Sequence, residues 1–484
     1  MHERYIKPEI KEIWSDEHKL NLWQELELIL IKARANLGRI KQKVYEEIRD
    51  ILTNTPIDLA WWKNRDKIIK HDLNAFIDER IQHLPKDLQK YFHEGMTSYD
   101  TEEEPFAMML KESLDCIFKE ITNLKIILRG MAMKYRYTPM VARTHGQWAQ
   151  IETFGRRCLS WYQDLETDIE NLQKTMEILQ YSKISGAIGN YGNIDPDLER
   201  EALTLLDFKP WYGATQIMPR EMYAPIAEAL CQLVETMDKI ALNIRLNSRS
   251  GNVLYREPFS KKQKGSSAMP HKKNPIATEQ IKGMHRMALG YLMMIMENVV
   301  TWEERAIEQS CVERVAWPDL FHVTLHSLQK ISDVLSELKV YPRNMMLEII
   351  NTRGTYASDA AKNLLKQLGF PHEDAYRIVQ LASFNAFPPD EDLVIKSFNE
   401  AELFLKEMAE CKFTQTKSIE EIIKNGMLEY CPDLEITLSD IDKWNGALIK
   451  IFQKPHNCKL WKNIFLLETQ LKHEPFVFEK VFGK

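Results

Sequence analysis

Glycine and proline, the residues that most often interrupt helices, are scarce in this sequence. The chain of 484 residues contains only 18 glycines and 20 prolines, whereas residues that favour helices, such as leucine, glutamate and lysine, are abundant. The sequence also shows no strand-rich region and no βαβ pattern of the dinucleotide-binding kind. We therefore expect an all-α protein.

Cysteines are few and widely spaced. No two of them form a CxxC pair, and their odd number argues against both a disulfide framework and a zinc site. We therefore expect the protein in a reducing, cytoplasmic compartment. The seven cysteines are Cys116, Cys158, Cys231, Cys311, Cys411, Cys431 and Cys458.

The chain lacks the positive charge of a nucleic-acid-binding protein. Its net charge is -6 and its pI is near 6.2, so we expect no nucleic-acid partner, and an anionic ligand would need a local basic pocket. No apolar run reaches the length of a membrane-spanning helix, and the first residues have no apolar core, so we expect no membrane partner and no signal peptide. A composition of 44% hydrophobic and 28% charged residues is ordinary for a globular protein.

Apolar residues recur at helical spacing over long stretches in the middle of the chain. From Leu110 to Leu128, and again from Ile226 to Ile244, an apolar residue appears every three or four positions. A further long helix is predicted from Ile276 to about Ile307. Helices of this length are typical of a bundle.

Helix length divides the chain into three predicted parts. Residues 1–100 form an N-terminal helical domain, residues 101–355 a central bundle of long helices, and residues 356–484 a C-terminal helical domain. A turn is predicted at residues 388–392, where two prolines are followed by acidic residues. The tail from about residue 453 is rich in aromatic residues, so we expect it to dock on a surface, with a partly ordered extension as the alternative.

One polar loop, at residues 261–275, interrupts the helical pattern. Its segment GSSAMPHKKNP (residues 265–275) contains a glycine and two prolines, so it cannot lie inside a helix. A plain connecting loop is one interpretation. The other is a functional site, because hydroxyls, cations and a carboxamide packed into a few residues can accept a proton and hold carboxylates.

The segment GSSAMPHKKNP resembles the signature loop of the fumarase/aspartase superfamily, whose pattern is roughly GSSxMPxKxNP, and its form is most similar to that of the adenylosuccinate lyases. The resemblance implies a three-domain, all-α fold with a central long-helix bundle. It implies that Ser266 is the base of a β-elimination and that Ser267 contacts the substrate. Lys272 and Asn274 would stabilise the carbanion. No metal or redox cofactor is implied.

A second motif is RTHGQ at residues 143–147. Histidine titrates near neutrality, so it suits a general acid that protonates a leaving nitrogen. By position alone, a histidine at a loop–helix junction is more often structural. RTHGQ resembles a second conserved region of adenylosuccinate lyases, and this resemblance implies that His145 is the general acid. Thr144 and Gln147 would hold a substrate carboxylate.

Further motifs resemble the family's substrate-binding positions. TSYD at residues 97–100 lies at a predicted helix start, where hydroxyls and backbone amides can hold a carboxylate or simply cap the helix. Arginines near residue 310 suit a phosphate, although ion pairs with neighbouring glutamates are the alternative. The implied binding residues are Arg4, Tyr5, His71, Asp72, His93, Thr97, Ser98, Gln216, Arg305, Ser310 and Arg314.

The sequence departs from the family pattern in one segment near the implied phosphate site. The family often has histidine, aspartate, histidine and serine where this chain has Glu303, Ala306, Gln309 and Cys311. The residues implied for the elimination itself are kept. The resemblance covers roughly residues 1–450 and leaves the tail unmatched.

The resemblance implies cleavage of a C–N bond in a succinyl-nucleotide, with release of fumarate. It also implies a homotetramer in which three subunits contribute to each active site. Argininosuccinate lyase and carboxymuconate cycloisomerase are the alternatives within the superfamily. A non-catalytic helical scaffold is the alternative from another class.

Overall fold

The computed structural model describes residues 1–387, 396–410 and 417–483, and about two thirds of the chain is helical with few strands. The all-α prediction is confirmed. The described residues fall into two compact units. Unit 1 comprises residues 1–128, 161–249 and 256–339, and unit 2 comprises residues 129–160, 250–255 and the described residues from 340 on. The predicted three-part division stays a prediction. Cys411 and the turn predicted at 388–392 lie outside the described residues.

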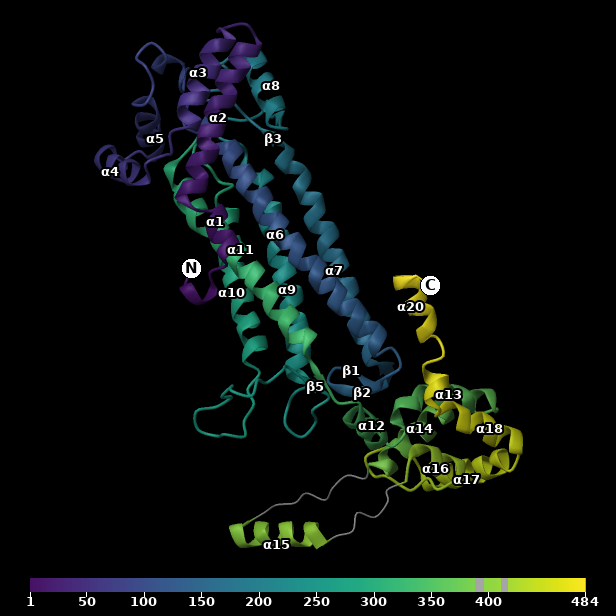
Figure 1. Cartoon of the computed structure of the whole chain (residues 1–484). Coiled ribbons are helices and arrows are strands. Elements are labelled where there is room, and N and C mark those ends of the chain that lie inside the picture. The colour runs from purple at the N-terminus through teal and green to yellow at the C-terminus, as the bar shows by residue number, and fades with distance from the viewer. Residues whose placement is uncertain (388–395, 411–416, 484) are drawn as a thin grey trace. The chain divides into compact units, whose positions relative to one another are not determined.

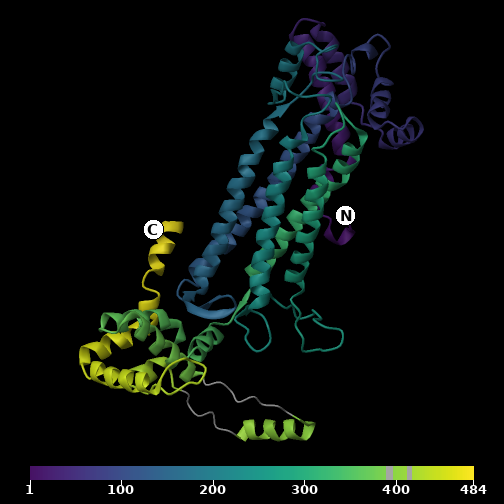
Figure 2. The same cartoon turned by 180° about the vertical axis from the view of Figure 1, so that it is seen from behind.

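Long helices form the centre of unit 1, where they run side by side in both views (Figures 1 and 2). Their apolar stripes are buried as the periodicity predicted, with Leu110, Leu124 and Leu128 on one helix and Ile226 and Ile244 on another all 0% exposed. Burying these stripes removes apolar area from water and holds the helices together. The long helices are α6 (Tyr99–Lys134), α7 (Phe154–Met176), α9 (Ala224–Leu246), α10 (Ile276–Glu297) and α11 (Ile307–Ser336).

The long helix predicted from Ile276 to about Ile307 is in fact two helices. α10 ends at Glu297, and α11 begins at Ile307. The connection is held by Asn298, whose side-chain amide donates to the backbone carbonyl of Gln309 at 3.1 Å. The prediction was wrong because apolar residues such as Val299 and Val300 continue the helical pattern through the connection.

Shorter helices of unit 1 pack at its N-terminal part. Those between residues 20 and 92 bury a separate apolar cluster that includes Trp23, Phe76 and Phe92. The elements are η1 (Glu3–Tyr5), α1 (Pro8–Ile13), α2 (Asp16–Asn36), α3 (Gln42–Thr53), α4 (Leu59–Ile69), α5 (Asp72–Ile81), η2 (Gln89–Tyr91), α8 (Pro196–Leu205) and η4 (Arg220–Met222). α2 and α3 pack against each other, as do α4 and α5.

Unit 2 is built from shorter helices around its own core. Trp461 is 0% exposed and packs with Phe465 in the core of unit 2, whereas Phe476 is 59% exposed. The first part of the aromatic tail is thus packed on the protein, and docking of the rest stays a prediction. The elements are α12 (Pro342–Asn351), η5 (Thr355–Ala357), α13 (Ser358–Gln367), α14 (His372–Ala386), α15 (Phe398–Glu410), α16 (Ile419–Lys424), α17 (Leu438–Phe452), α18 (Pro455–Ile464), α19 (Leu467–Gln470) and α20 (Glu474–Phe482).

Among the described residues, the few strands form three two-stranded sheets. β1 and β2 make an antiparallel hairpin in unit 2, and β3 pairs with β4 in parallel. The strands are β1 (Pro139–Thr144), β2 (Gln147–Thr153), β3 (Tyr181–Ser182), β4 (Lys209–Pro210), β5 (Tyr255–Arg256) and β6 (Lys339–Val340). None of the described helices is long and apolar enough to span a bilayer.

Candidate active site

A pocket of about 210 Å3 lies in unit 1 and contains three of the predicted binding residues. Asp72 enters it from the first turn of α5, and Ser310 and Arg314 enter it from successive turns of α11. The two α11 residues share a face because they are four positions apart in a helix. The structure thus brings together residues that are separated by more than 200 positions in the sequence.

Both positively and negatively charged side chains line this pocket. Arg314 forms an ion pair with Asp72 at 2.8 Å, and the ammonium group of Lys19 lies 4.0 Å from the same carboxylate. Glu102, on α6, is a further lining residue that the sequence did not single out. Burial, and to a lesser extent the nearby charge of Asp72, raise the pKa of Glu102 to about 7, against the opposing effect of the nearby cations. The charge of the pocket therefore changes near neutral pH.

Arg305 and Gln216, both predicted to bind substrate, contact each other. The guanidinium of Arg305 donates to the side-chain oxygen of Gln216 at 2.9 Å and lies over the ring of Tyr99 at 4.3 Å. The amide of Gln216 in turn donates to the backbone carbonyl of Ala187 at 3.0 Å. These contacts fix the direction in which each side chain points.

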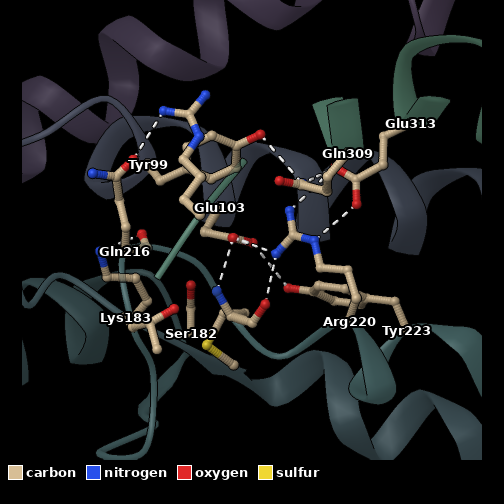
Figure 3. Close-up of polar contacts among 12 residues, drawn as sticks. Tyr99, Glu103, Ser182, Lys183, Gln216, Arg220, Tyr223, Gln309 and Glu313 are labelled. Atoms are coloured by element: carbon tan, nitrogen blue, oxygen red, sulfur yellow. Dashed lines mark hydrogen bonds and ion pairs between the residues drawn. The ribbon is translucent and has the colours of Figure 1, made fainter. Parts of the chain in front are cut away.

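A buried charge network lies behind these residues, and sequence reasoning missed it. Arg220 forms ion pairs with Glu103 at 2.6 Å and with Glu313 at 2.8 Å (Figure 3). Gln309 donates to Glu313 at 2.6 Å and to the hydroxyl of Tyr99 at 3.3 Å. Glu313 had been considered as a surface partner for the nearby arginines of α11, but its described partners are these buried groups. Gln309, one of the departures from the family pattern, is therefore part of a polar network.

A second buried ion pair holds the loop that follows β3. Lys183 and Asp100 are both fully buried, 2.6 Å apart. The same carboxylate accepts from the backbone amides of Ser185 and Gly186 at 3.1 and 3.2 Å, and from that of Thr97 at 2.9 Å. Asp100 thus connects the segment before α6 with the loop after Lys183.

The two predicted pocket histidines of the N-terminal part have structural contacts. The ring nitrogen Nδ1 of His71 accepts from the backbone amide of Asn74 at 3.3 Å and caps α5. His93 contacts the carboxylate of Glu27 at 2.7 Å. Burial disfavours the charged form of His93, but the hydrogen bond and charge of Glu27 outweigh burial and raise its pKa above the ordinary value. Neither histidine lines the pocket, and their binding role stays a prediction.

Within one chain, Arg4 and Tyr5 lie away from the pocket. The ring of Tyr5 packs edge-on against His326 of α11, with centroids 5.3 Å apart. His326 is twelve residues beyond Arg314 on the same helix, which corresponds to roughly 18 Å along its axis. A role for these two residues in the same pocket would therefore require a second copy of the chain.

The signature loop is anchored at both ends within unit 1. Glu257 accepts from the backbone amides of Ala277 and Thr278 at 3.2 and 3.0 Å, and so caps the start of α10. Gly265 passes so close to the backbone of Lys272 that an added Cβ would lie 2.2 Å from its carbonyl oxygen. Only glycine fits this close approach.

Ser266 is half-buried within the signature loop. Its hydroxyl oxygen accepts from the backbone amides of Ala268 and Met269 at 3.3 and 3.1 Å. Amide donors of this kind favour the deprotonated form of a hydroxyl. Ser267 and Lys272 are exposed, and Asn274 is half-buried, so all three can meet a ligand from outside the loop.

His145 lies in unit 2, at the exposed turn between β1 and β2. The prediction that it sits at a loop–helix junction was wrong, because residues 139–144 and 147–153 pair as a hairpin and α7 begins only at Phe154. Thr144 and Gln147 are cross-strand partners that flank the turn. His145 and Gly146 both have positive φ values, 54° and 78°. This is the conformation of a tight, two-residue hairpin turn.

Comparisons with known proteins agree with these features. A family model described as "Lyase" matches residues 4–290. The adenylosuccinate lyase of Synechocystis sp. is 36% identical over 387 residues, which are 80% of this chain and 89% of that protein. The adenylosuccinate lyase of Thermotoga maritima is 33% identical over 442 residues, which are 91% of this chain and 98% of that protein.

Solved structures show the same fold at low sequence identity. A fumarate lyase from Mesorhizobium sp. BNC1 superposes with a TM-score of 0.73 at 19% identity, covering 95% of this chain and 98% of that one. The β-carboxy-cis,cis-muconate cycloisomerase of Acinetobacter calcoaceticus gives a TM-score of 0.69 at 18% identity, covering 95% and 97%. These two similarities show the fold alone, whereas the two adenylosuccinate lyases are similar to this chain in sequence over most of their length. The chain therefore belongs to the adenylosuccinate lyase family, within the fumarase/aspartase superfamily.

Proposed function

We propose that this protein catalyses the β-elimination of fumarate from adenylosuccinate, which gives AMP, and from SAICAR, which gives AICAR, in purine nucleotide biosynthesis. The observation that carries the proposal is the signature loop. Its hydroxyls, its ammonium group and its carboxamide are presented by a backbone that is anchored at both ends. The likeness in sequence to adenylosuccinate lyases over most of the chain supports this substrate over those of the sister enzymes.

In the proposed reaction, Ser266 removes a proton from the carbon next to one carboxylate of the succinyl group. The negative charge moves into that carboxylate, where Lys272 and Asn274 stabilise it. The C–N bond then breaks, and His145 protonates the departing nitrogen. A serine hydroxyl is a weak base in water, so the proposal requires the signature loop to exclude water when substrate is bound.

We propose that the nucleotide binds in the pocket of unit 1. Arg314 and Ser310 offer a bidentate cation and a hydroxyl to a phosphate, and Lys19 adds a second positive charge. A phosphate that binds Arg314 competes with Asp72, its present ion-pair partner. We propose that the departures at residues 303–311 alter the surroundings of this phosphate and leave the elimination itself unchanged.

We also propose that the protein is a homotetramer whose sites combine residues of three subunits. Exposed apolar side chains on α10 favour burial against another copy, since a contiguous apolar surface is unfavourable in water. They include Leu289, Met293 and Met294. Arg4 and Tyr5, which their own chain keeps away from the pocket, would complete the site of a neighbour.

An absorbance assay with purified protein tests the proposed activity. We expect fumarate and AMP from adenylosuccinate, and no turnover of argininosuccinate or carboxymuconate. Ser266→Ala and His145→Ala should remain folded and lose several orders of magnitude in kcat, as expected when the base or the acid is removed. Fumarate formation by Ser266→Ala at a near-normal rate would refute its role as the base. Absence of turnover with every succinyl-nucleotide would favour the non-catalytic scaffold.

A further inference from the structure

Glu348 of α12 binds both strands of the hairpin that carries His145. Its carboxylate is almost completely buried, at 3% exposed, and its oxygen Oε1 accepts from three donors. One is the guanidinium of Arg143 on β1. The others are the indole N–H of Trp148 on β2 at 3.2 Å and the side-chain amide of Asn252 at 2.8 Å. Charge-assisted hydrogen bonds of this kind are stronger than those between neutral groups.

The residues held by Glu348 are those next to the turn. Arg143 and Trp148 are cross-strand partners, one step from Thr144 and Gln147, and the turn closes between them. The other end of the Arg143 guanidinium donates to the backbone carbonyl of Gly146 at 3.0 Å. A continuous chain of contacts therefore runs from the buried carboxylate through Arg143 into the turn itself.

The turn needs such support because of its backbone conformation. His145 has a φ of 54°, which is unfavourable for a residue with a side chain. It is also exposed, so few contacts of its own side chain hold it in place. Ile349, the residue after Glu348, packs with Val141 of β1 and Ile151 of β2 in a small apolar cluster. α12 thus supports the hairpin by both packing and charge.

We propose that Glu348 is a positioning residue, which acts through Arg143 and Trp148 to hold the His145 turn in the geometry needed for proton transfer. This inference rests on the proposed role of His145 as the general acid. A small displacement of an acid from its target lowers the rate strongly, because proton transfer requires hydrogen-bond distance. Glu348 contacts none of the predicted binding residues directly, but Thr144 and Gln147 flank the same turn, so a displaced turn would also weaken substrate binding.

Two substitutions distinguish the contribution of the negative charge of Glu348 from that of the shape of its side chain. Glu348→Ala removes all three acceptor contacts, whereas Glu348→Gln keeps the shape and a neutral acceptor oxygen. We expect Glu348→Ala to lower kcat about 10- to 100-fold, as for a supporting residue around a catalytic group, and to raise KM as well, because Thr144 and Gln147 flank the same turn. Glu348→Gln should recover most of this loss. The matched control is Glu373→Gln, an exposed glutamate of α14 whose partner is Arg377, and its kcat should stay unchanged.

A double-mutant cycle with His145 identifies the route of the effect. If Glu348 acts through His145, the variant carrying both His145→Ala and Glu348→Ala should have the same residual kcat as His145→Ala alone. A further loss in the double variant equal to that of the single substitution would overturn the inference. So would a wild-type kcat for Glu348→Ala. Thermal unfolding of each variant shows whether it is folded at the assay temperature.

The cycle also distinguishes failure of this inference from failure of the proposed function. If His145→Ala loses activity and Glu348→Ala does not, only the positioning role is wrong. If His145→Ala keeps the wild-type rate, the acid assignment is wrong, and the inference falls with it.

Discussion

Replacing Arg220 by methionine tests the buried charge network of unit 1. The guanidinium is buried between Glu103 and Glu313, with ion pairs of 2.6 and 2.8 Å. Methionine fills a similar volume but leaves both carboxylates without their cation. Removing one partner of a buried ion pair typically costs about 3–5 kcal/mol. Unfolding entropy of roughly 2.1 cal/mol/K per residue corresponds to about 1 kcal/mol/K for this chain, so Tm should fall by about 3–5 °C.

The loss of stability should depend on pH with a definite sign. Burial raises the pKa of Glu313 above its ordinary value, and the charge of Arg220 limits that rise. Without Arg220 the pKa rises further, so the folded variant binds a proton that the folded wild type releases. Stability of the variant relative to the wild type therefore falls as pH increases. The difference in Tm should be larger at pH 8 than at pH 6.

Thermal unfolding followed by circular dichroism at both pH values measures this difference. The control is Arg200→Met, which removes an exposed ion pair with Asp197 and should shift Tm by less than about 1 °C, since surface pairs contribute about 0–1 kcal/mol. Wild-type Tm values for Arg220→Met, or a larger loss at pH 6 than at pH 8, would refute the reasoning.

Two further predictions concern the pocket and the tail. The pKa of Glu102 is about 7, so Glu102 gains its negative charge as pH rises from 6 to 8, and this charge should weaken binding of an anionic substrate. KM of the wild type should therefore rise over this range, and KM of Glu102→Gln should rise less. An identical pH dependence of KM in both proteins would contradict the assignment. Trp461 is fully buried between Phe452 and Phe465, so Trp461→Ala should lose about 3–5 kcal/mol. An unchanged Tm would contradict the docking of the tail.

The helical fold and the main site segments could be predicted from sequence because their signals are local. Apolar spacing along α6 and α9 marks the buried face of each helix, and glycine and proline mark the signature loop. Such signals fail where the apolar pattern continues past the end of a helix, as it does between α10 and α11. They also missed the hairpin, because buried residues do not alternate along β1 and its pairing with β2 is irregular between Val141 and Arg143.

The supporting polar network could not be predicted, since it depends on contacts between distant segments. Glu103 lies in the first turn of α6, where a glutamate is commonly solvated and favours the helix dipole, yet it is buried and paired with Arg220, more than a hundred residues away. Glu348 likewise lies about two hundred residues from Arg143 and Trp148. Nothing in the local pattern of a glutamate on a helix distinguishes such a partner from a solvated charge.

Mixing two inactive variants tests the central claim most directly, because the account assembles each active site from separate copies of the chain. Ser266 and His145 lie in different compact units, and the proposal takes them from different subunits. After unfolding and refolding together, Ser266→Ala and His145→Ala should form tetramers in which about a quarter of the sites have both residues intact. The account predicts recovery of up to about a quarter of wild-type activity. No recovery, once subunit exchange is demonstrated, would contradict it.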